Sequence, residues 1–419
     1  MASTLLREPG WLAARRGRAL ALSGELALPS FKGEPGWEFN SLAGLDLEAF
    51  PPTEGGDPSA RARAGLGLFG ERDEVLALDQ VDAAALTEGH EEGGALVLPL
   101  AVAAERHPEL VERHFGTVVA GDDAFVARNE SSWSGGAFVY VPRGVALSRP
   151  VVITVTQDRS GEALNWRTLI VLEEGASAEV WEQYLSGSDE TEGLFNTVVE
   201  LSVGPNATLR YVNGQALSER SWIFGTQRAQ VERDGTLDWA ALGFGSARGK
   251  VRMETNLAGE GSSAKVTGAY AGHGRQHLDF DTTQEHAAPH TTSDLAFRGI
   301  LDGRSTAVWR GMIKVDPGAQ QTDAFQESRN LLLSKRAHAD AIPGLEIQAN
   351  DVRCTHAAAI AQIDQDQLFY LQAHGLGREG ATRLVIDGFL QALVQRFAAG
   401  PVRETMADAL ERRLQAILG

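Results

Sequence analysis

A cysteine and a histidine that stand two residues apart, Cys354 and His356, are the pair in this sequence best suited to metal chemistry. Cys354 is the only cysteine among 419 residues. Thiolate and imidazole both coordinate iron, zinc and copper, so the two side chains could share one metal ion or one edge of a cluster. On a β-strand, residues i and i+2 share a face and lie about 7 Å apart along the backbone, which permits joint coordination. The alternative is that Cys354 is a small buried hydrophobe, because cysteine is among the most buried residue types.

A single cysteine also limits what this chain can hold. It excludes an intrachain disulfide, so nothing here indicates an oxidising compartment. It equally excludes an iron–sulfur cluster ligated by thiolates of this chain alone, since such sites normally use several thiolates. We therefore expect no cofactor to be held stably by the isolated chain.

A second group of metal-ligating residue types gathers in the stretch 273–290. Two histidine pairs are spaced H-x3-H, but Gly272, Gly274 and Pro289 argue against a helix that would place each pair on one face. On a strand, residues four apart are separated by about 13 Å and cannot chelate together. The favoured interpretation is therefore polar residues on the outer faces of strands. The group comprises His273, His277, His286 and His290, with Asp279, Asp281 and Glu285.

Charge and composition argue against several functions. The formal charge of −18 disfavours nucleic acid and anionic lipid as partners. The sequence contains no apolar run long enough to span a bilayer and no signal-peptide pattern, so we expect a cytoplasmic protein with no membrane contact. No Gly-x4-Gly-Lys-Ser/Thr loop is present, which argues against an ATPase site in this chain.

The chain divides into three regions by pattern. Residues 1–115 have helix-forming segments separated by loops, among them 11–16, 101–106 and a proline-initiated segment at 107–114. Residues 116–355 form a β core, in which short alternating runs follow one another from about Ala124 to Ala349 without a helical period. Residues 356–419 return to helical periodicity.

The β core repeats a short plan. A small turn residue leads into an alternating strand at Gly175, Pro205, Gly235 and Gly261, at steps close to 30 residues. A recurring strand–turn unit of this length is typical of stacked coils that cover one another's apolar faces. We therefore predict a right-handed parallel β-helix, flanked by N-terminal and C-terminal α-helical regions. An antiparallel β-sandwich is the alternative.

The C-terminal region is predicted to hold three helices. The first follows Asp364 and ends at Gly375, with acidic residues in its first turn. The second spans about 378–397 with an apolar stripe, and Gly400–Pro401 ends it. The third runs from Glu404 toward Leu418. Such a tail either packs on the end of the β core or is offered to a partner.

An ordered series of blocks in this chain resembles the SufB/SufD family, whose members are scaffold subunits of the SUF iron–sulfur cluster assembly machinery. The resemblance covers most of the chain and is strongest from Arg298 to Phe397. The blocks are 298–301, 311–315, 320–326, 330–334, 342–347, Cys354–Thr355–His356, 368–371 and Gly388–Phe389.

Two positions favour the SufD branch over the SufB branch. The principal assembly cysteine of SufB aligns with Ser328, and the acidic residue that follows the shared histidine in SufB aligns with Ala357. A serine hydroxyl is a poor sulfur acceptor, and alanine can neither ligate a metal nor move a proton. The shared histidine carries over to His356, where the resemblance implies a role in iron or cluster handling. Cys354 is the accompanying candidate ligand.

The resemblance implies a non-enzymatic scaffold subunit. It would pair with a SufB-like paralogue through the β-helix core and bind a SufC-like ATPase through the C-terminal helices. Iron or a nascent cluster would be shared with SufB at their interface, and self-pairing into a homodimer is compatible with such paralogy.

Three other functional hypotheses remain open from the sequence. The first is a SufB-like paralogue that is itself the cluster scaffold. The second is a β-helix carbohydrate-active enzyme, for which Asp279 and Asp281 are the candidate carboxylates. The third, a cupin-like metalloenzyme, needs three converging ligands, and the histidine spacing fits it poorly.

Overall fold

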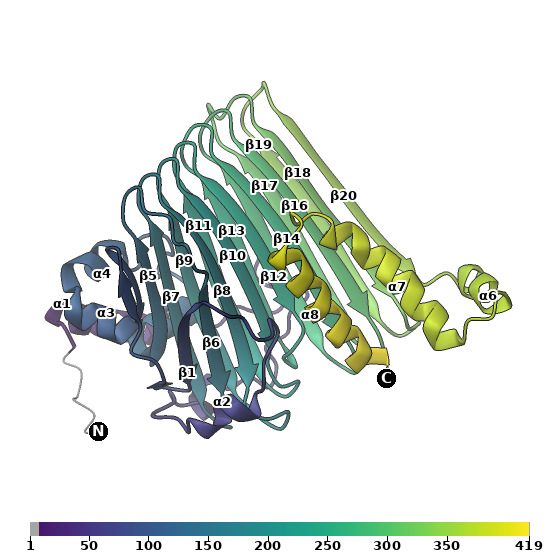
Figure 1. The fold of residues 1–419 in the computed structure, drawn as a ribbon, viewed down its shortest axis with the longest axis horizontal. Coiled ribbons are helices and arrows are strands. Elements are labelled where there is room, and N and C mark those ends of the chain that lie inside the picture. Colours follow the sequence, from purple (N-terminus) through teal and green to yellow (C-terminus); the bar gives the residue numbers. More distant parts are fainter. Residues whose placement is uncertain (1–7, 419) are drawn as a thin grey trace.

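The computed structural model describes residues 8–418 and is built around two ten-stranded sheets (Figure 1). We call them the tail sheet and the head sheet, after the terminal helices that cover each. The tail sheet contains, in spatial order, β2 (Ala84–Ala85), β1 (Leu76–Val81), β6 (Val151–Gln157), β8 (Ser177–Ser186), β10 (Thr208–Ala216), β12 (Thr236–Gly243), β14 (Ser263–Gly272), β16 (Thr292–Leu301), β18 (Asp323–Leu332) and β20 (Arg353–Gln362). The head sheet contains β3 (His90–Glu92), β4 (Ala95–Pro99), β5 (Gly135–Val141), β7 (Ala163–Leu172), β9 (Leu194–Val203), β11 (Trp222–Val231), β13 (Arg248–Leu257), β15 (His277–His286), β17 (Thr306–Val315) and β19 (His338–Ile347).

From β5 and β6 onward the chain alternates between the two sheets, and each strand pairs in parallel with the strand one coil later. At the N-terminal end, β2 pairs antiparallel with β1, β3 with β4, and β4 with β5. His277 pairs with Thr306, so one coil takes about 29 residues. The result is a parallel β-solenoid of about 8 turns, which confirms the predicted parallel β-helix and excludes the antiparallel sandwich. The predicted turn residues lie at its corners. Gly175 has φ +70° there, and its N–H donates to Pro205 O of the next coil at 2.8 Å.

The core lies between the two sheets. Strand alternation sends every second side chain inward, and these form one continuous cluster from Leu76 to Ala339. Large aromatic residues fill it, including Trp166, Trp239 and Trp309, each almost fully buried.

Helices cover the outer faces of both sheets. The head sheet is covered near its N-terminal end by α1 (Gly10–Glu25), α3 (Leu100–Arg106), α4 (Pro108–His114) and α5 (Ala124–Ser132), while α2 (Ser59–Arg63) lies at the rim. A buried ion pair fastens this region: Arg167 Nη2 lies 2.6 Å from Glu200 Oε1. Glu200 also accepts hydrogen bonds from the backbone N–H groups of Gly116, Val118 and Val119, which ties the segment after α4 to the sheet.

The tail sheet is covered by the C-terminal helices α7 (Arg378–Val394) and α8 (Pro401–Leu418) (Figure 1). Leu390, Leu393 and Met406 of these helices share an apolar cluster with Trp181 and Leu242 on the outer face of the sheet. Helix α6 (Gln365–Ala373) precedes them, and Asp364 caps its N-terminus with a side chain that accepts from the N–H groups of Asp366 and Gln367. The three predicted helices are confirmed, except that α8 begins at Pro401 rather than Glu404, because proline is well suited to a first helical position.

Three boundaries differ from the sequence prediction. Residues 1–115 are not helices and loops alone, because β1 to β4 lie within them and extend both sheets. The stretch 124–349 is not entirely β, because α5 is a helix capped by Asp123 and buried against the head sheet. The β core also continues past residue 355, since β20 runs to Gln362. In each case pairing or burial in the folded molecule overrides a weak local pattern.

Candidate functional site

Cys354 and His356 lie on a β-strand, near the beginning of β20. Cys354 pairs in register with Ala324 and His356 pairs with Gln326, both of which are buried residues of β18. Cys354 and His356 therefore do share one face of the strand, and both side chains lie on the inner face of the tail sheet. Because β20 is the last strand of the tail sheet, both residues lie where the interior of the solenoid ends.

The two side chains have different environments. Cys354 is half-buried against a small cluster that contains Ile313 and Val315, and this burial raises the pKa of its thiol, with the negative charge of Asp323 adding to the effect. His356 is exposed, and no hydrogen bond or ion pair within residues 8–418 fixes its imidazole. Cys354 thus has features of a packing residue, whereas His356 is free to receive a ligand or a partner.

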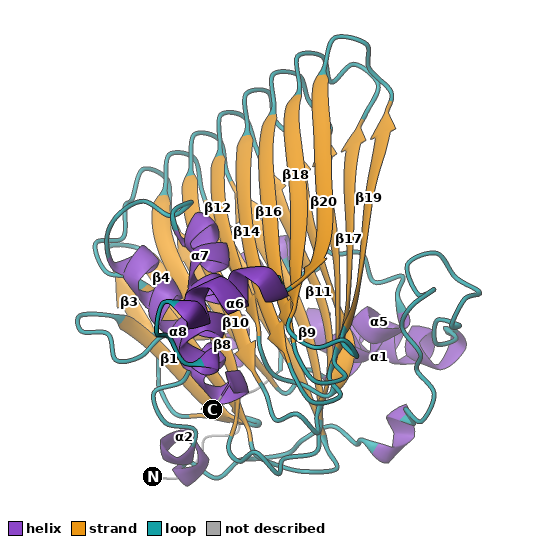
Figure 2. Cartoon of the chain, turned by 90° about the vertical axis from the view of Figure 1, so that its right-hand side faces the viewer, coloured by secondary structure: helices purple, strands orange, loops and turns teal. Residues whose placement is uncertain are grey.

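The solenoid is open at this end. Strands β19 and β20 are the last of their sheets, and within the described chain neither has a partner on its outer edge (Figure 2). Leu345 and Ile347 continue the inner rows of Ile313 and Val315, which are fully buried, yet they are 38% and 41% exposed. Ile360 on β20 is 45% exposed. An uncapped core of this kind, bordered by two free strand edges, has the features of a surface that another chain can cover.

The positions that separate the two branches of the resemblance lie nearby. Ser328 on β18 is fully buried on the inner face, 3.5 Å from Asn330 Nδ2, and Asn330 in turn accepts from the Tyr270 hydroxyl at 2.5 Å. Ala357 follows His356 directly, so it lies on the opposite, outer face of β20. Ser328 is thus part of a buried polar network and has no thiol to offer.

The histidine group at 273–290 is not brought together. His277, Asp279, Asp281 and Glu285 do lie on the outer face of β15, as the favoured interpretation held, and acids among them pair with Lys250, Arg228 and Lys314.

His286 is an exception to that interpretation. It lies inside the solenoid, where its ring nitrogens contact Thr291 Oγ1 at 2.7 Å and Ser293 Oγ at 2.9 Å. Among residues 8–418, no group of three or more His, Cys, Asp or Glu side chains could hold a metal ion.

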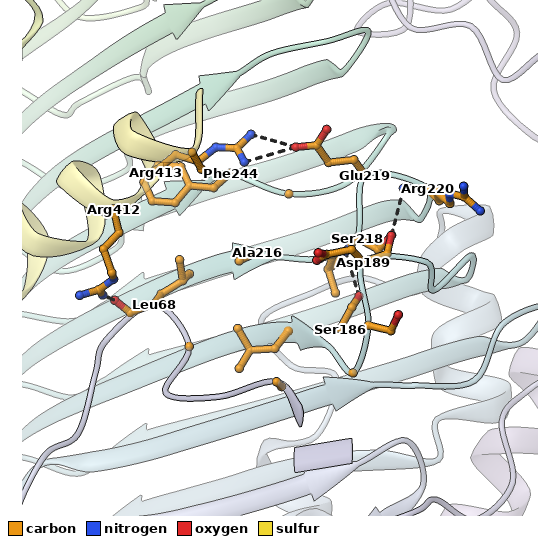
Figure 3. A pocket seen from close by; sticks show the side chains of 18 of the residues that line it. Leu68, Ser186, Asp189, Ala216, Ser218, Glu219, Arg220, Phe244, Arg412 and Arg413 are labelled. Carbon is orange, nitrogen blue, oxygen red and sulfur yellow. Dashed lines mark hydrogen bonds and ion pairs between the residues drawn. The ribbon is translucent and has the colours of Figure 1, made fainter. Parts of the chain in front are cut away.

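A large rim cavity was not foreseen from the sequence. It has a volume of about 900 Å³ and lies between the turns that follow β8 and β10 and the end of α8 (Figure 3). Its cations have partners: Arg413 lies 3.3 Å from Glu219, and Arg220 lies 2.7 Å from Glu190. These paired charges leave no convergent set of reactive groups in the cavity.

The C-terminal helices present a second exposed apolar surface. Phe369 and Tyr370 of α6 are 72% and 62% exposed, and Leu384 of α7 is 51% exposed. In contrast, the residues of α7 and α8 that face the tail sheet are buried. The sequence period identifies the helices but not which of their apolar residues remain uncovered.

Comparison with known proteins decides the family. Residues 154–389 match the model described as SUF system FeS cluster assembly, SufBD core domain, and residues 75–153 match the SufBD protein N-terminal region. This chain belongs to the SufBD family. It is 29% identical to the iron–sulfur cluster assembly protein SufD of Bacillus subtilis (strain 168) over 98% of this chain and 95% of that protein.

Further relatives agree with this membership. An iron–sulfur cluster assembly SufBD family protein of Staphylococcus haemolyticus is 30% identical over 72% of this chain and 65% of its own length, and one of Staphylococcus epidermidis has the same values. The chain is thus a SufD-like member of an iron–sulfur cluster assembly family. No helix within residues 8–418 is both long and apolar enough to cross a membrane.

Proposed function

We propose that this chain is a non-enzymatic scaffold subunit of a cytoplasmic SUF iron–sulfur cluster assembly complex. The observation that carries the proposal is the open end of the solenoid, where a SufBD core leaves apolar interior residues and two strand edges uncovered beside His356. The buried Ser328 in place of a thiol favours a supporting SufD-like subunit over the SufB-like scaffold itself.

In this proposal a SufB-like paralogue covers the open end. Backbone N–H and C=O groups on the free edges of β19 and β20 are ready to pair with strands of a second chain. Leu345, Ile347 and Ile360 supply the apolar surface that such pairing would bury. A paralogue with the same solenoid would present a matching end, and the same geometry supports a homodimer when the partner is absent.

The SufC-like ATPase is assigned to the C-terminal helices. The support is the exposed pair Phe369 and Tyr370 on α6, together with the firm packing of α7 and α8 on the tail sheet. Exposed aromatic residues on a supported helix are the usual anchors of a protein interface.

Iron or a nascent cluster is the cargo, and His356 is its proposed contact on this chain. A neutral imidazole can take the place of a thiolate on one iron of a cluster. At the open end it would stand beside thiolates of the SufB-like partner. Cys354 is the second candidate ligand, although its raised thiol pKa disfavours the thiolate form that binds metal.

Anaerobic reconstitution of the complex of this chain with its SufB-like and SufC-like partners tests the proposal. His356→Ala should lower the iron and sulfide bound per complex, while the three chains still co-elute. His338→Ala is the matched control, because His338 is also an exposed histidine on an end strand. Unchanged loading in His356→Ala would remove His356 from the site, and failure of the wild-type chains to co-elute would remove the proposed function.

A further inference from the structure

One rim of the solenoid carries cations that lack acidic partners. In a chain of net charge −18, most arginines lie within 4.0 Å of a carboxylate. Arg248, Arg275 and Arg304 are exposed, and within residues 8–418 none of them forms an ion pair or a guanidinium hydrogen bond. Unpaired like charges held near one another repel, so their grouping calls for an anion.

The three arginines come from successive coils. They lie at or just before the start of β13, β15 and β17, where the connecting turns stack on one another. His277 N–H donates to Ala247 O at 2.9 Å, and Arg304 N–H donates to Gly274 O at 2.8 Å. Arg275 and Arg304 occupy equivalent positions on coils that are about 4.8 Å apart, and Arg248 lies two positions further along the preceding coil, opposite His277. The three residues form a short, staggered ladder along the rim.

This ladder lines a pocket of about 430 Å³. Its other wall is the N-terminal segment, which contributes Phe39 and Ser41. Asn40 fixes that segment, because its Nδ2 donates to Gly249 O at 2.6 Å and to Asp279 Oδ2 at 3.0 Å. Phe39 is 43% exposed, so the pocket has one aromatic wall as well as its three guanidinium groups.

Neutral donors complete the lining. His277 Nδ1 lies 2.7 Å from Thr306 Oγ1, and His277 Nε2 is shielded from solvent with no partner among the described residues. Burial lowers the pKa of His277 to about 4, and the positive charges of Arg248 and Lys250 contribute to the same effect. The imidazole is therefore neutral near pH 7, with one nitrogen left to donate or accept.

The acids near this pocket are already engaged. Asp279 and Asp281 lie 3.0 and 3.4 Å from Lys250 Nζ, and Asp340 lies 3.2 Å from His338 Nε2. In the larger cavity on the same rim, Arg413 is paired with Glu219 (Figure 3), and Arg220 is paired with Glu190. Within residues 8–418, the smaller pocket thus has three arginines that lack an acidic partner, whereas among the arginines that line the larger cavity only Arg412 lacks one.

We propose that this pocket binds a small phosphate ester with an aromatic ring, of the nucleoside monophosphate type. Guanidinium forks match phosphate oxygens in geometry and charge, and hydroxyls of Ser41 and Thr306 add neutral donors. Phe39, which lines the pocket and is 43% exposed, supplies aromatic surface for the ring. A pocket closed on one side by the N-terminal segment suits a small molecule better than an extended peptide.

Calorimetric titration of the full chain with AMP tests the proposal, with adenosine, inorganic phosphate and citrate as comparison ligands. AMP should bind saturably, inorganic phosphate more weakly, and adenosine not measurably. The double variant Arg275→Gln/Arg304→Gln should weaken AMP binding by about tenfold or more, since each charge-assisted hydrogen bond contributes on that order. Arg220→Gln is the control, because it removes the same charge from the same rim at a paired arginine.

The outcomes separate clearly. Loss of AMP binding in the double variant, with normal binding in the control and equal thermal unfolding midpoints, supports the site. Absence of saturable AMP binding to the wild-type chain overturns it, as does equal weakening by the control. Citrate binding as tight as that of AMP would overturn the phosphate assignment, and adenosine binding as tight as AMP would show that the arginines do not recognise the ligand.

Discussion

Cys354 and His356 show how two residues on the same face of one strand can acquire different chemistry. Both project into the solenoid end, but only Cys354 reaches the apolar cluster around Ile313 and Val315. Its raised thiol pKa follows from that burial, whereas the exposed His356 has no competing partner in the described chain. The sequence predicts the pair through its spacing. It does not predict this division, because burial depends on which coil is the last.

Cys354→Ser tests the role of the thiol. If Cys354 is a packing residue, cluster loading on the reconstituted complex should remain near the wild-type level. The free energy of unfolding of the isolated chain should fall by about 1 kcal/mol, because a hydroxyl replaces a half-buried sulfur. Iron and sulfide analysis together with denaturant unfolding check this. A loss of loading as large as that in His356→Ala would instead make Cys354 a ligand.

His286 gives the chain an acid-sensitive interior. It is fully buried, and burial lowers its pKa to about 4, below the 6.5 of a free histidine. The unfolded chain therefore binds a proton as the pH falls through about 6.5, whereas the folded chain does so only near pH 4. Stability from this group is complete above pH 6.5 and declines below it, by about 2 kcal/mol between pH 7 and pH 5.

His286→Gln isolates that contribution, because glutamine retains hydrogen-bonding groups for Thr291 and Ser293 but does not titrate. The wild-type chain should lose more stability than the variant between pH 7 and pH 5 in denaturant unfolding. Parallel pH profiles for the two proteins would contradict this account.

At the scale of elements, the C-terminal helices have two distinct faces. The faces of α7 and α8 toward the tail sheet cover apolar residues such as Trp181 and Leu242. Deleting the whole tail would therefore expose an apolar sheet surface. Loss of partner binding could then not be distinguished from loss of solubility. The exposed residues of α6 offer a sharper test, since they contribute little to the packed interface.

Phe369→Ala/Tyr370→Ala should abolish or strongly weaken binding of the SufC-like ATPase while SufB pairing persists. Truncation of two exposed anchor aromatics commonly costs about 2 kcal/mol or more each in binding. Pull-down and calorimetry with each partner measure this. Leu390→Ala serves as the contrast, because it removes a buried contact with the tail sheet and should lower thermal stability. Retained ATPase binding in the double variant would place that interface elsewhere.

At the scale of the molecule, the sequence predicts the architecture well because the repeat is local. A turn residue and an alternating run recur in each coil, and parallel stacking follows from them. It misses β1 to β4 and α5, because these depend on pairing or burial against distant coils. The open end could not be predicted either. Leu345 and Ile347 have the same apolar pattern as buried rows, and they are exposed because no further coil stacks on β19 and β20 within residues 8–418.

That open end leads to a prediction about assembly. Ile347→Lys places a charge on an exposed inner position of β19, where an edge lysine is a common device against strand pairing. It should abolish co-elution with the SufB-like partner and any homodimer of the isolated chain, because the charge would be buried unpaired at the interface. The stability of the monomer should change by less than about 1 kcal/mol, since Ile347 is 41% exposed there. Leu384→Lys, a matched change on α7, should leave SufB pairing intact. Size-exclusion chromatography with light scattering checks both variants, and SufB pairing undisturbed by Ile347→Lys would show that the interface lies on another surface.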